Sequence, residues 1–409
     1  MLYSDTLLKS FNDKYDELLI KEEKLRKEIA TMIYCFYTNN KSGINYYVKK
    51  YMLDSGVHDL KIWNSATRSI ETLPDGSNQV GMFTEKTVNI MPKIHIDIVR
   101  KVIDLVCTIL NAGADRYLLD GVNINQTETD NLMELYEEMN YSQSIIEQYK
   151  QGWLFNTILA QPVYRNGTIE IDIITPNFCS VETYENDYSR MKAVMISKSI
   201  NNEDMIVYWS DTEHYYINSK GVKLNVTDEE GNSNGMRNPF GTLPFAKLSF
   251  NQSSDFWGEP QQDLVENNIW YDVKESNQIF VEMFQGLGVG LGVNLGKTEV
   301  VSISPNTIIQ VDNVRADDQP PSLTFASTSA PLAELRESTD YMYRRIGNSK
   351  GLSSASMTNE VTEQSGVSKA YDSLELQIKK DSHKVVMKNY ERELFEKIRL
   401  VNNYYAKKN

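Results

Sequence analysis

The sequence predicts an α+β protein whose helical segments flank a central antiparallel β region. Apolar residues recur at helical spacing before residue 152 and again after residue 261, whereas residues 153–249 alternate with a period of two between Asn, Asp and Gly turns. The chain has 409 residues and a mass of 46.9 kDa, which is enough for two or three structural units.

Three helices are predicted in the N-terminal part of the chain. The first spans residues 5–37 and is amphipathic. The second begins near Pro92, because proline is favoured in the first turn of a helix, and its apolar stripe ends at Gly113. The third covers residues 127–151 and ends at Gly152.

The β region consists of short strands separated by turn residues. The segments with strand character are ILAQPVY, GTIEIDII, KAVMIS, DMIVYWS and EHYYIN, and together they predict an antiparallel meander. Residues 234–244 are rich in Gly and Pro and indicate a boundary, after which residues 245–250 form one more short strand.

The next part of the chain is predicted to be columnar. One helix spans residues 261–284, the glycine-rich segment 286–292 ends it, and VVSIS and TIIQVD are predicted strands. A second helix covers residues 330–346, with Ser329 as its cap and Pro331 in its first turn.

A loop and one long helix complete the chain. Residues 347–366 are poor in apolar side chains and rich in Ser, Thr and Asn, which is typical of a mobile loop. Residues 365–405 form the helix. The apolar residues expected to form one stripe along it are Tyr371, Leu374, Ile378, Val385, Val386, Tyr390, Leu394, Ile398 and Val401.

The charge and cysteine content limit the possible functions. The formal net charge is −14, from 42 basic and 56 acidic side chains, which argues against broad neutralisation of nucleic-acid phosphates. Cys35, Cys107 and Cys179 show no CxxC spacing, so neither a disulfide framework nor a zinc site is expected. We expect a cytoplasmic origin, because no signal-peptide pattern or membrane-length apolar run is present.

No catalytic, cofactor-binding or metal-binding residues are predicted. Residues 292–298, GVNLGKT, resemble a phosphate-binding loop, but that motif needs a glycine where Leu291 stands. The alternative of a nucleotide-binding protein, with Lys297 in this loop, therefore fits poorly. The four histidines are scattered and no GxSxG motif is present, so we do not expect an enzyme.

Several segments follow one another in an informative order. They are an amphipathic segment at residues 89–104, a helix running into a strand past Gly152, the strand IDIITPNF, the turn Gly241–Phe245, Ser254-Asp255 before a helix, and Ser365-Gly366 opening a long helix. By this arrangement residues 89–400 resemble the portal, or head–tail connector, proteins of tailed bacteriophages.

This resemblance implies a portal-type ring subunit with an α/β wing, a helical stem, a small β-containing clip and a long helix that leads to a crown. The implied parts are residues 1–258 for the wing, 259–285 for the first stem helix, 286–328 for the clip, 329–346 for the second stem helix, 347–364 for the tunnel loop and 365–409 for the crown-leading helix. Family members often continue into further crown helices, so the resemblance implies a reduced crown here.

The resemblance also implies a structural role without a cofactor. Subunits of this family form rings, usually dodecamers, at one capsid vertex of the virion, and are made in the host cytoplasm. Double-stranded DNA is packaged and ejected through the ring. The implied partners are other copies of the chain, DNA, the major capsid protein, the terminase motor, neck, adaptor or tail proteins and a scaffold protein, with no membrane.

The same resemblance assigns individual residues. The residues implied to face DNA from the tunnel loop are Ser349, Lys350, Ser353, Ser354, Ser356 and Thr358, whose hydroxyls could make brief hydrogen bonds to phosphate. The implied clip residues are Lys297 and Arg315, and the implied stem-packing residues are Val265, Ile269, Val273 and Phe280. DNA passes easily only when its contacts are weak, which a negatively charged subunit favours.

One further alternative stays open, namely another structural virion or scaffold protein that uses residues 365–405 as a coiled coil. The helix fits a strict seven-residue repeat poorly, because Asp381 and Ser382 interrupt its apolar stripe.

Overall fold

The computed structural model describes residues 17–54, 62–64, 69–71, 85–200, 203–226, 235–251, 253, 255–287, 289–293, 308–311, 322–326, 331–358 and 366–406. The chain divides into two compact units. Unit 1 comprises Met1–Thr38, Val99–Val265 and Thr362–Asn409, and unit 2 comprises Asn39–Ile98 and Glu266–Val361. Both units contain helices and strands, which confirms the predicted α+β class.

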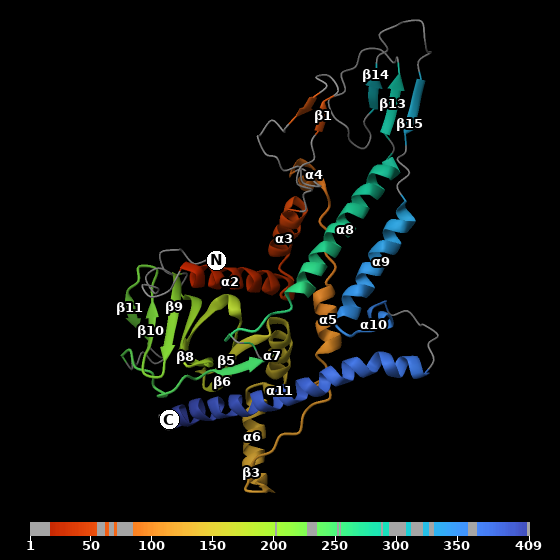
Figure 1. Ribbon diagram of the computed structural model, residues 1–409. Coiled ribbons are helices and arrows are strands. Elements are labelled where there is room, and N and C mark those ends of the chain that lie inside the picture. The colour runs from red at the N-terminus through yellow and green to blue at the C-terminus, as the bar shows by residue number, and fades with distance from the viewer. Residues whose placement is uncertain are drawn as a thin grey trace. The chain divides into compact units, whose positions relative to one another are not determined.

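The helices of unit 1 follow the predicted order with shifted ends (Figure 1). They are α2 (Glu17–Tyr37), α5 (Ile98–Val106), α6 (Gln126–Glu138), α7 (Tyr141–Phe155) and α11 (Gly366–Ala406), and the first residue of α5 belongs to unit 2. The single helix predicted over residues 127–151 is wrong, because Asn140 takes a left-handed conformation with φ 50° and separates α6 from α7. Gly152 lies inside α7, where a Cβ would overlap the Leu248 side chain.

Two antiparallel sheets form the β region of unit 1. The five-stranded sheet has the order β11-β10-β9-β8-β7 and the three-stranded sheet the order β12-β5-β6. Their strands are β5 (Thr157–Arg165), β6 (Thr168–Ile174), β7 (Cys179–Tyr184), β8 (Asp187–Ile200), β9 (Glu203–Ser210), β10 (His214–Ile217), β11 (Lys223–Asn225) and β12 (Ala246–Ser249). The five predicted meander strands and the strand after residue 245 are confirmed, whereas β7 and β11 were missed.

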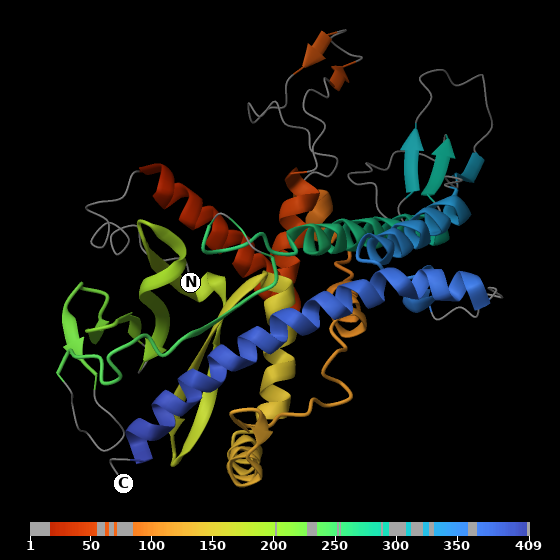
Figure 2. The ribbon, with the colours of Figure 1, turned by 60° about the horizontal axis from the view of Figure 1, so that its bottom comes forward.

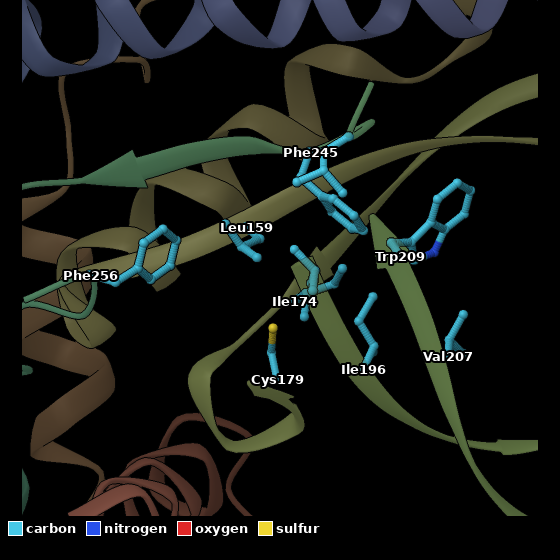
Figure 3. Close-up of a cluster of buried hydrophobic side chains, with 10 residues drawn as sticks. Leu159, Ile174, Cys179, Ile196, Val207, Trp209, Phe245 and Phe256 are labelled. Atoms are coloured by element: carbon cyan, nitrogen blue, oxygen red, sulfur yellow. The ribbon is translucent and has the colours of Figure 1, made fainter. Parts of the chain in front are cut away.

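Side chains from both sheets form the main hydrophobic core of unit 1. Figure 3 shows Leu159, Ile174 and Ile196 converging from β5, β6 and β8. The buried members of this core are Leu159, Ile174, Cys179, Val194, Ile196, Val207, Trp209, Leu243, Phe245 and Phe256. Alternation along each strand sends these residues to one face, which is why the period of two predicted the strands correctly.

Arg26 ties helix α2 to this sheet region. Its guanidinium donates to the carbonyl oxygens of Pro176 at 2.8 Å and Cys179 at 2.9 Å, and it pairs with Glu23. The guanidinium also lies 4.5 Å from the centre of the Trp257 ring. One planar cation thus binds the carbonyl oxygens of a 3-10 turn and of the first residue of β7 and covers an aromatic face, which the amphipathic pattern of α2 did not reveal.

The long helix α11 has two different apolar faces. Its second half packs on β12 and β5, with Met387, Tyr390, Leu394, Ile398 and Val401 buried. Leu374, Ile378 and Val385 are exposed, because at 3.6 residues per turn they point about half a turn away from that buried stripe. The prediction of one continuous stripe is therefore wrong, and the residues fall on opposite faces.

Unit 2 contains a pair of long helices and a small sheet. Its helices are α3 (Lys41–Asp54), α4 (Glu85–Ile90), α8 (Gln262–Leu287, whose first turn belongs to unit 1), α9 (Leu332–Ser349) and α10 (Ser354–Thr358). Strands β1 (Ile62–Asn64) and β2 (Ser69–Glu71) pair antiparallel. Strands β13 (Val289–Val293), β14 (Ile308–Val311) and β15 (Ser322–Ala326) form a sheet in which β13 is central, parallel to β14 and antiparallel to β15.

Two predictions in unit 2 are corrected by these elements. The glycine-rich segment does end α8, at Leu287, but its residues from 289 onward belong to strand β13, which is hydrogen-bonded to a neighbour on each side and was not predicted. The predicted loop over residues 347–364 is wrong for residues 347–349, which end α9, and for residues 354–358, which form α10. The predicted strand VVSIS and the cap Ser329 lie outside the described residues.

Burial of His214 in unit 1 predicts acid sensitivity. The ring stacks on Trp209, with 3.3 Å between ring centres, and burial lowers the pKa of His214 from 6.5 to about 3. Unfolded chains take up this proton as the pH falls through 6.5, so stability present above pH 6.5 is lost progressively towards pH 3. We expect His214→Phe to remove up to about 3 kcal/mol of that loss between pH 7 and pH 4. Urea unfolding followed by tryptophan fluorescence between pH 7 and pH 4 measures it, and parallel losses in both proteins would contradict the prediction.

Candidate functional site

Helices α8 and α9 run antiparallel beside each other in unit 2 (Figures 1 and 2), and several polar contacts join them. Lys274 Nζ donates to Ser338 Oγ at 2.6 Å, and Thr339 Oγ1 donates to Gln278 Oε1 at 3.3 Å. The ion pair of Arg336 with Glu282, at 3.1 Å, lies further along the pair. Thr339 and Gln278 are buried, and the single proton of Thr339 Oγ1 is shared between Gln278 Oε1 and the closer Leu335 O at 3.0 Å, so the three contacts together favour one register of the two helices.

A second polar contact holds an extended segment against α8. Asn268, Asp272 and Ser276 follow one another at steps of four on one helix face and are fully buried. Ile98 N–H donates to Asn268 Oδ1 at 3.1 Å, Ile96 N–H to Asp272 Oδ1 at 3.0 Å, and Ile94 N–H to Ser276 Oγ at 3.0 Å. We call these three α8 residues the polar ladder.

The polar ladder explains a shifted helix boundary. The N–H groups of the alternate residues Ile94, Ile96 and Ile98 all point at α8, as alternate N–H groups do along one edge of a strand. Asn268 Nδ2 also donates to Ile96 O at 3.0 Å. The chain therefore stays extended after Pro92, and α5 begins only at Ile98. The prediction that this helix begins near Pro92 is wrong for that reason.

Asp272 is the charged member of the ladder. Its Oδ2 lies 2.7 Å from Nδ1 of His95, and its Oδ1 accepts from Ile96 N–H. Burial raises the pKa of Asp272, while the hydrogen bonds from His95 and Ile96 act against that rise. The carboxylate thus serves as a structural acceptor, because both of its oxygens are engaged by the segment that it holds.

The turn between α9 and α10 contains the residues predicted to face DNA. Lys350 caps α9, Gly351 follows with φ 78°, and the N–H groups of Lys350 and Leu352 donate to Gly347 O at 2.9 and 3.1 Å. Met357 of α10 is fully buried against Gly347, where a Cβ would overlap its side chain. Tyr343 Oη also donates to Met357 O at 3.2 Å. The turn is therefore closed onto α9 by packing and by backbone hydrogen bonds.

The hydroxyl groups of this turn are used within the chain. Ser349 Oγ donates to Ile346 O at 2.8 Å and Thr358 Oγ1 donates to Ser354 O at 3.0 Å. Ser354 Oγ donates to Asn348 Oδ1 at 3.4 Å, and the Ser353 and Ser356 hydroxyls lie 2.8 Å apart. Phosphate oxygens can only accept hydrogen bonds, so most of these hydroxyls have no proton left to offer them. This outcome could not be read from the serine-rich composition.

Two cationic side chains stand at the same end of α9. Lys350 is partly exposed, and Arg345 is exposed one turn earlier in the helix. Lys350 was identified from the sequence, whereas Arg345, which lies within the helix predicted over residues 330–346, was missed. Cations near a helix C-terminus are stabilised by the partial negative charge there, so both side chains are favourably placed at this end of α9.

The remaining predicted site residues have different outcomes. Val265, Ile269 and Val273 of α8 are buried, and Phe280 is partly buried, so this stripe packs within the chain itself. Lys297 and Arg315 lie outside the described residues, as do residues 359–364 of the predicted tunnel loop.

The described residues offer no metal cluster or reactive thiol. Among them, no group of three or more His, Cys, Asp and Glu side chains is placed to hold a metal ion. The three cysteines are free, and burial raises the pKa of the Cys179 thiol to about 12. A thiol with so high a pKa stays protonated at neutral pH and is a poor nucleophile.

The polar ladder can be tested with two neighbouring asparagines of α8. Asn268→Ala removes an acceptor for Ile98 and a donor to Ile96, and we expect it to lower the free energy of unfolding by about 1–3 kcal/mol. Asn267→Ala is the matched control, because Asn267 is partly exposed on the same helix. Chemical denaturation compares the variants, and hydrogen exchange at Ile96 and Ile98 should accelerate only in Asn268→Ala. Equal effects of both substitutions would show that the ladder contributes nothing specific.

Comparison with known proteins adds no assignment. No protein-family model matches the chain, and no curated protein matches it at a significant level. Among the described residues, no helix has the length and apolar character needed to cross a bilayer. The function has therefore to be inferred from the arrangement of the residues themselves.

Proposed function

We propose that this chain is the subunit of a phage portal ring, the head–tail connector through which double-stranded DNA enters the capsid and later leaves it. The observation that carries this proposal is the order of elements between residues 262 and 406. A long helix leads to a three-stranded sheet, a second helix returns antiparallel to the first, a closed turn follows, and one helix of 41 residues ends the series. Portal subunits share this order by the resemblance described above.

Each element then takes one role in the ring. Helices α8 and α9 are the stem, the sheet β14-β13-β15 is the clip that meets the packaging motor and later the neck, and α11 leads to the crown. The helices and sheets of residues 17–258 form the wing. The turn from Gly347 to Thr358 is the described part of the tunnel loop.

Exposed apolar side chains on the helix pair support assembly into a ring. Trp270 and Met283 on α8 and Tyr341 on α9 are large and exposed in the single chain. When identical copies pack side by side around an axis, each contact is head-to-tail and joins two different surfaces. The exposed apolar side chains of one copy would then be covered by another part of the next copy.

Electrostatics supports passage of DNA without tight binding. Each copy carries a formal charge of −14, and the hydroxyls of the α9–α10 turn are mostly engaged within the chain. Lys350 in this turn and Arg345 at the end of α9 are cations that could contact phosphate. Few cations on an acidic subunit give weak, exchangeable contacts, whereas many would hold the DNA in place.

The first test is the size and shape of the purified protein. A ring of twelve copies of 46.9 kDa has a mass of about 560 kDa. We expect sedimentation velocity to detect a particle near this mass and negative-stain microscopy to show a ring with an axial hole. A protein that remains monomeric at all concentrations and salt conditions would refute the proposal.

The second test concerns Lys350. We expect Lys350→Ala to reduce the retention of packaged DNA severalfold and to change ring assembly less, because it removes a cation of the tunnel loop that could contact phosphate. Lys350→Arg keeps the charge and should behave like the wild type. In vitro packaging followed by nuclease protection measures retention. Normal retention together with failed assembly would contradict this role.

A further inference from the structure

A small β-hairpin projects from unit 1 with apolar side chains at its tip. Strands β3 (Leu119–Asp120) and β4 (Asn123–Ile124) pair antiparallel across a turn in which Gly121 has φ 64°. The side chain of Val122 is 92% exposed and that of Leu119 58%. Tyr117 and Ile124 are exposed as well, so the hairpin presents four apolar side chains to solvent.

This hairpin is held rigidly on helix α6. Asn125 N–H donates to Leu118 O at 2.9 Å, and Leu118 N–H donates to Thr129 Oγ1 at 3.0 Å. Asn125 Oδ1 also accepts from Glu128 N–H at 3.2 Å and caps α6. The apolar tip is therefore a shaped surface on a fixed support.

The surface around the tip is strongly acidic. Residues 117–149 contain seven Asp or Glu residues and no Lys or Arg. The exposed acidic residues of α6 are Glu128, Asp130, Glu134, Glu137 and Glu138. We call residues 117–138 the acidic hairpin module.

A surface of the opposite charge lies on helix α11. Leu374, Ile378 and Val385 form an exposed apolar stripe, with Ile378 62% and Val385 63% exposed. Lys384, Lys388 and Arg392 are exposed beside and beyond this stripe. Lys384 pairs with Asp381 at 2.9 Å, whereas Lys388 and Arg392 make no ion pair with any described residue. We call this surface the α11 stripe.

The two surfaces do not cover each other within one chain. Arg116, next to the hairpin, is fixed to Glu391 of α11 by contacts of 2.6 and 3.1 Å. Figure 1 shows the hairpin at the end of α6 that is farther from α11. Both apolar surfaces nevertheless remain exposed, so each needs an occupant from another molecule.

We propose that the acidic hairpin module of one copy docks on the α11 stripe of a neighbouring copy. The apolar tip would cover Leu374, Ile378 and Val385, and the acidic side chains of α6 would face Lys388 and Arg392. The apolar tip would thus meet an apolar stripe, and acidic side chains would meet basic ones. Because the two surfaces differ, the contact is head-to-tail and repeats from copy to copy. This inference rests on the proposed function only in that copies associate side by side.

A mixing experiment tests this contact directly. Leu119→Asp with Val122→Asp damages only the hairpin tip, and Ile378→Asp with Val385→Asp damages only the α11 stripe. All four side chains are exposed, so both double variants should fold. Tyr188→Asp with Val222→Asp is the matched control, because these apolar residues are exposed elsewhere on unit 1.

We expect each double variant alone to lose the ring and sediment as a monomer, while the control keeps the mass of the wild type. An equimolar mixture of the two double variants should form a dimer of twice 46.9 kDa. In that dimer the intact hairpin of one chain docks on the intact stripe of the other, and no further copy can add at either end.

A charge exchange gives a second measurement. Lys388→Glu with Arg392→Glu should weaken assembly at least tenfold, and adding Glu134→Lys with Glu137→Lys should restore it. Rings that persist in both apolar double variants would overturn this contact and leave the portal proposal intact. A mixture that stays monomeric would also overturn it, because the intact hairpin of one variant and the intact stripe of the other would then have failed to associate. A wild-type protein that is itself monomeric would overturn both proposals.

Discussion

The arrangement of unit 2 depends on the buried polar ladder of helix α8. An extended segment packed against a helix has no strand beside it to accept its N–H groups, and burying them unpaired is costly. Asn268, Asp272 and Ser276 supply three acceptors, and successive acceptors are separated by about one helical turn along α8. The segment must then remain extended up to Ile98, and α8 must keep this face towards it. Other side chains of α8, namely Lys274, Gln278 and Glu282, make the polar contacts with α9.

Polar side chains add contacts that favour one register in unit 2, whose interior also contains buried apolar residues such as Ile269, Val273 and Ile346. In unit 1 the two sheets enclose a continuous hydrophobic core, which tolerates exchange of one apolar residue for another of similar volume. In unit 2 the helix pair is joined by hydrogen bonds that favour one register, because donor and acceptor meet only at one relative position. A pair of helices that must keep its register under load would gain from such contacts, which fits the stem role proposed for α8 and α9.

Helix α11 shows how one element can serve two purposes. Its buried face from Met387 to Val401 anchors it to β12 and β5, and this contact alone explains its second half. The exposed stripe in its first half has no such explanation within the chain. A soluble helix exposes several large apolar residues on one face when another molecule covers them. The hydroxyl groups near the α9–α10 turn show the opposite case. Their composition suggested that they could bind a ligand, but hydrogen bonds within the chain engage them in holding the turn.

The sequence by itself determined the class of the protein and most of its regular elements. Alternation identified β5, β6, β8, β9 and β10, and helical spacing identified α2, α8, α9 and α11, because local periodicity reflects which face of an element is buried. Tertiary structure decided the rest. It placed the break at Asn140, the strand at residues 289–293 and the late start of α5, and it separated the two faces of α11. Each of these depends on a partner distant in sequence, such as the acceptors of α8 for Ile94 and Ile96, and no local pattern reports a partner of that kind.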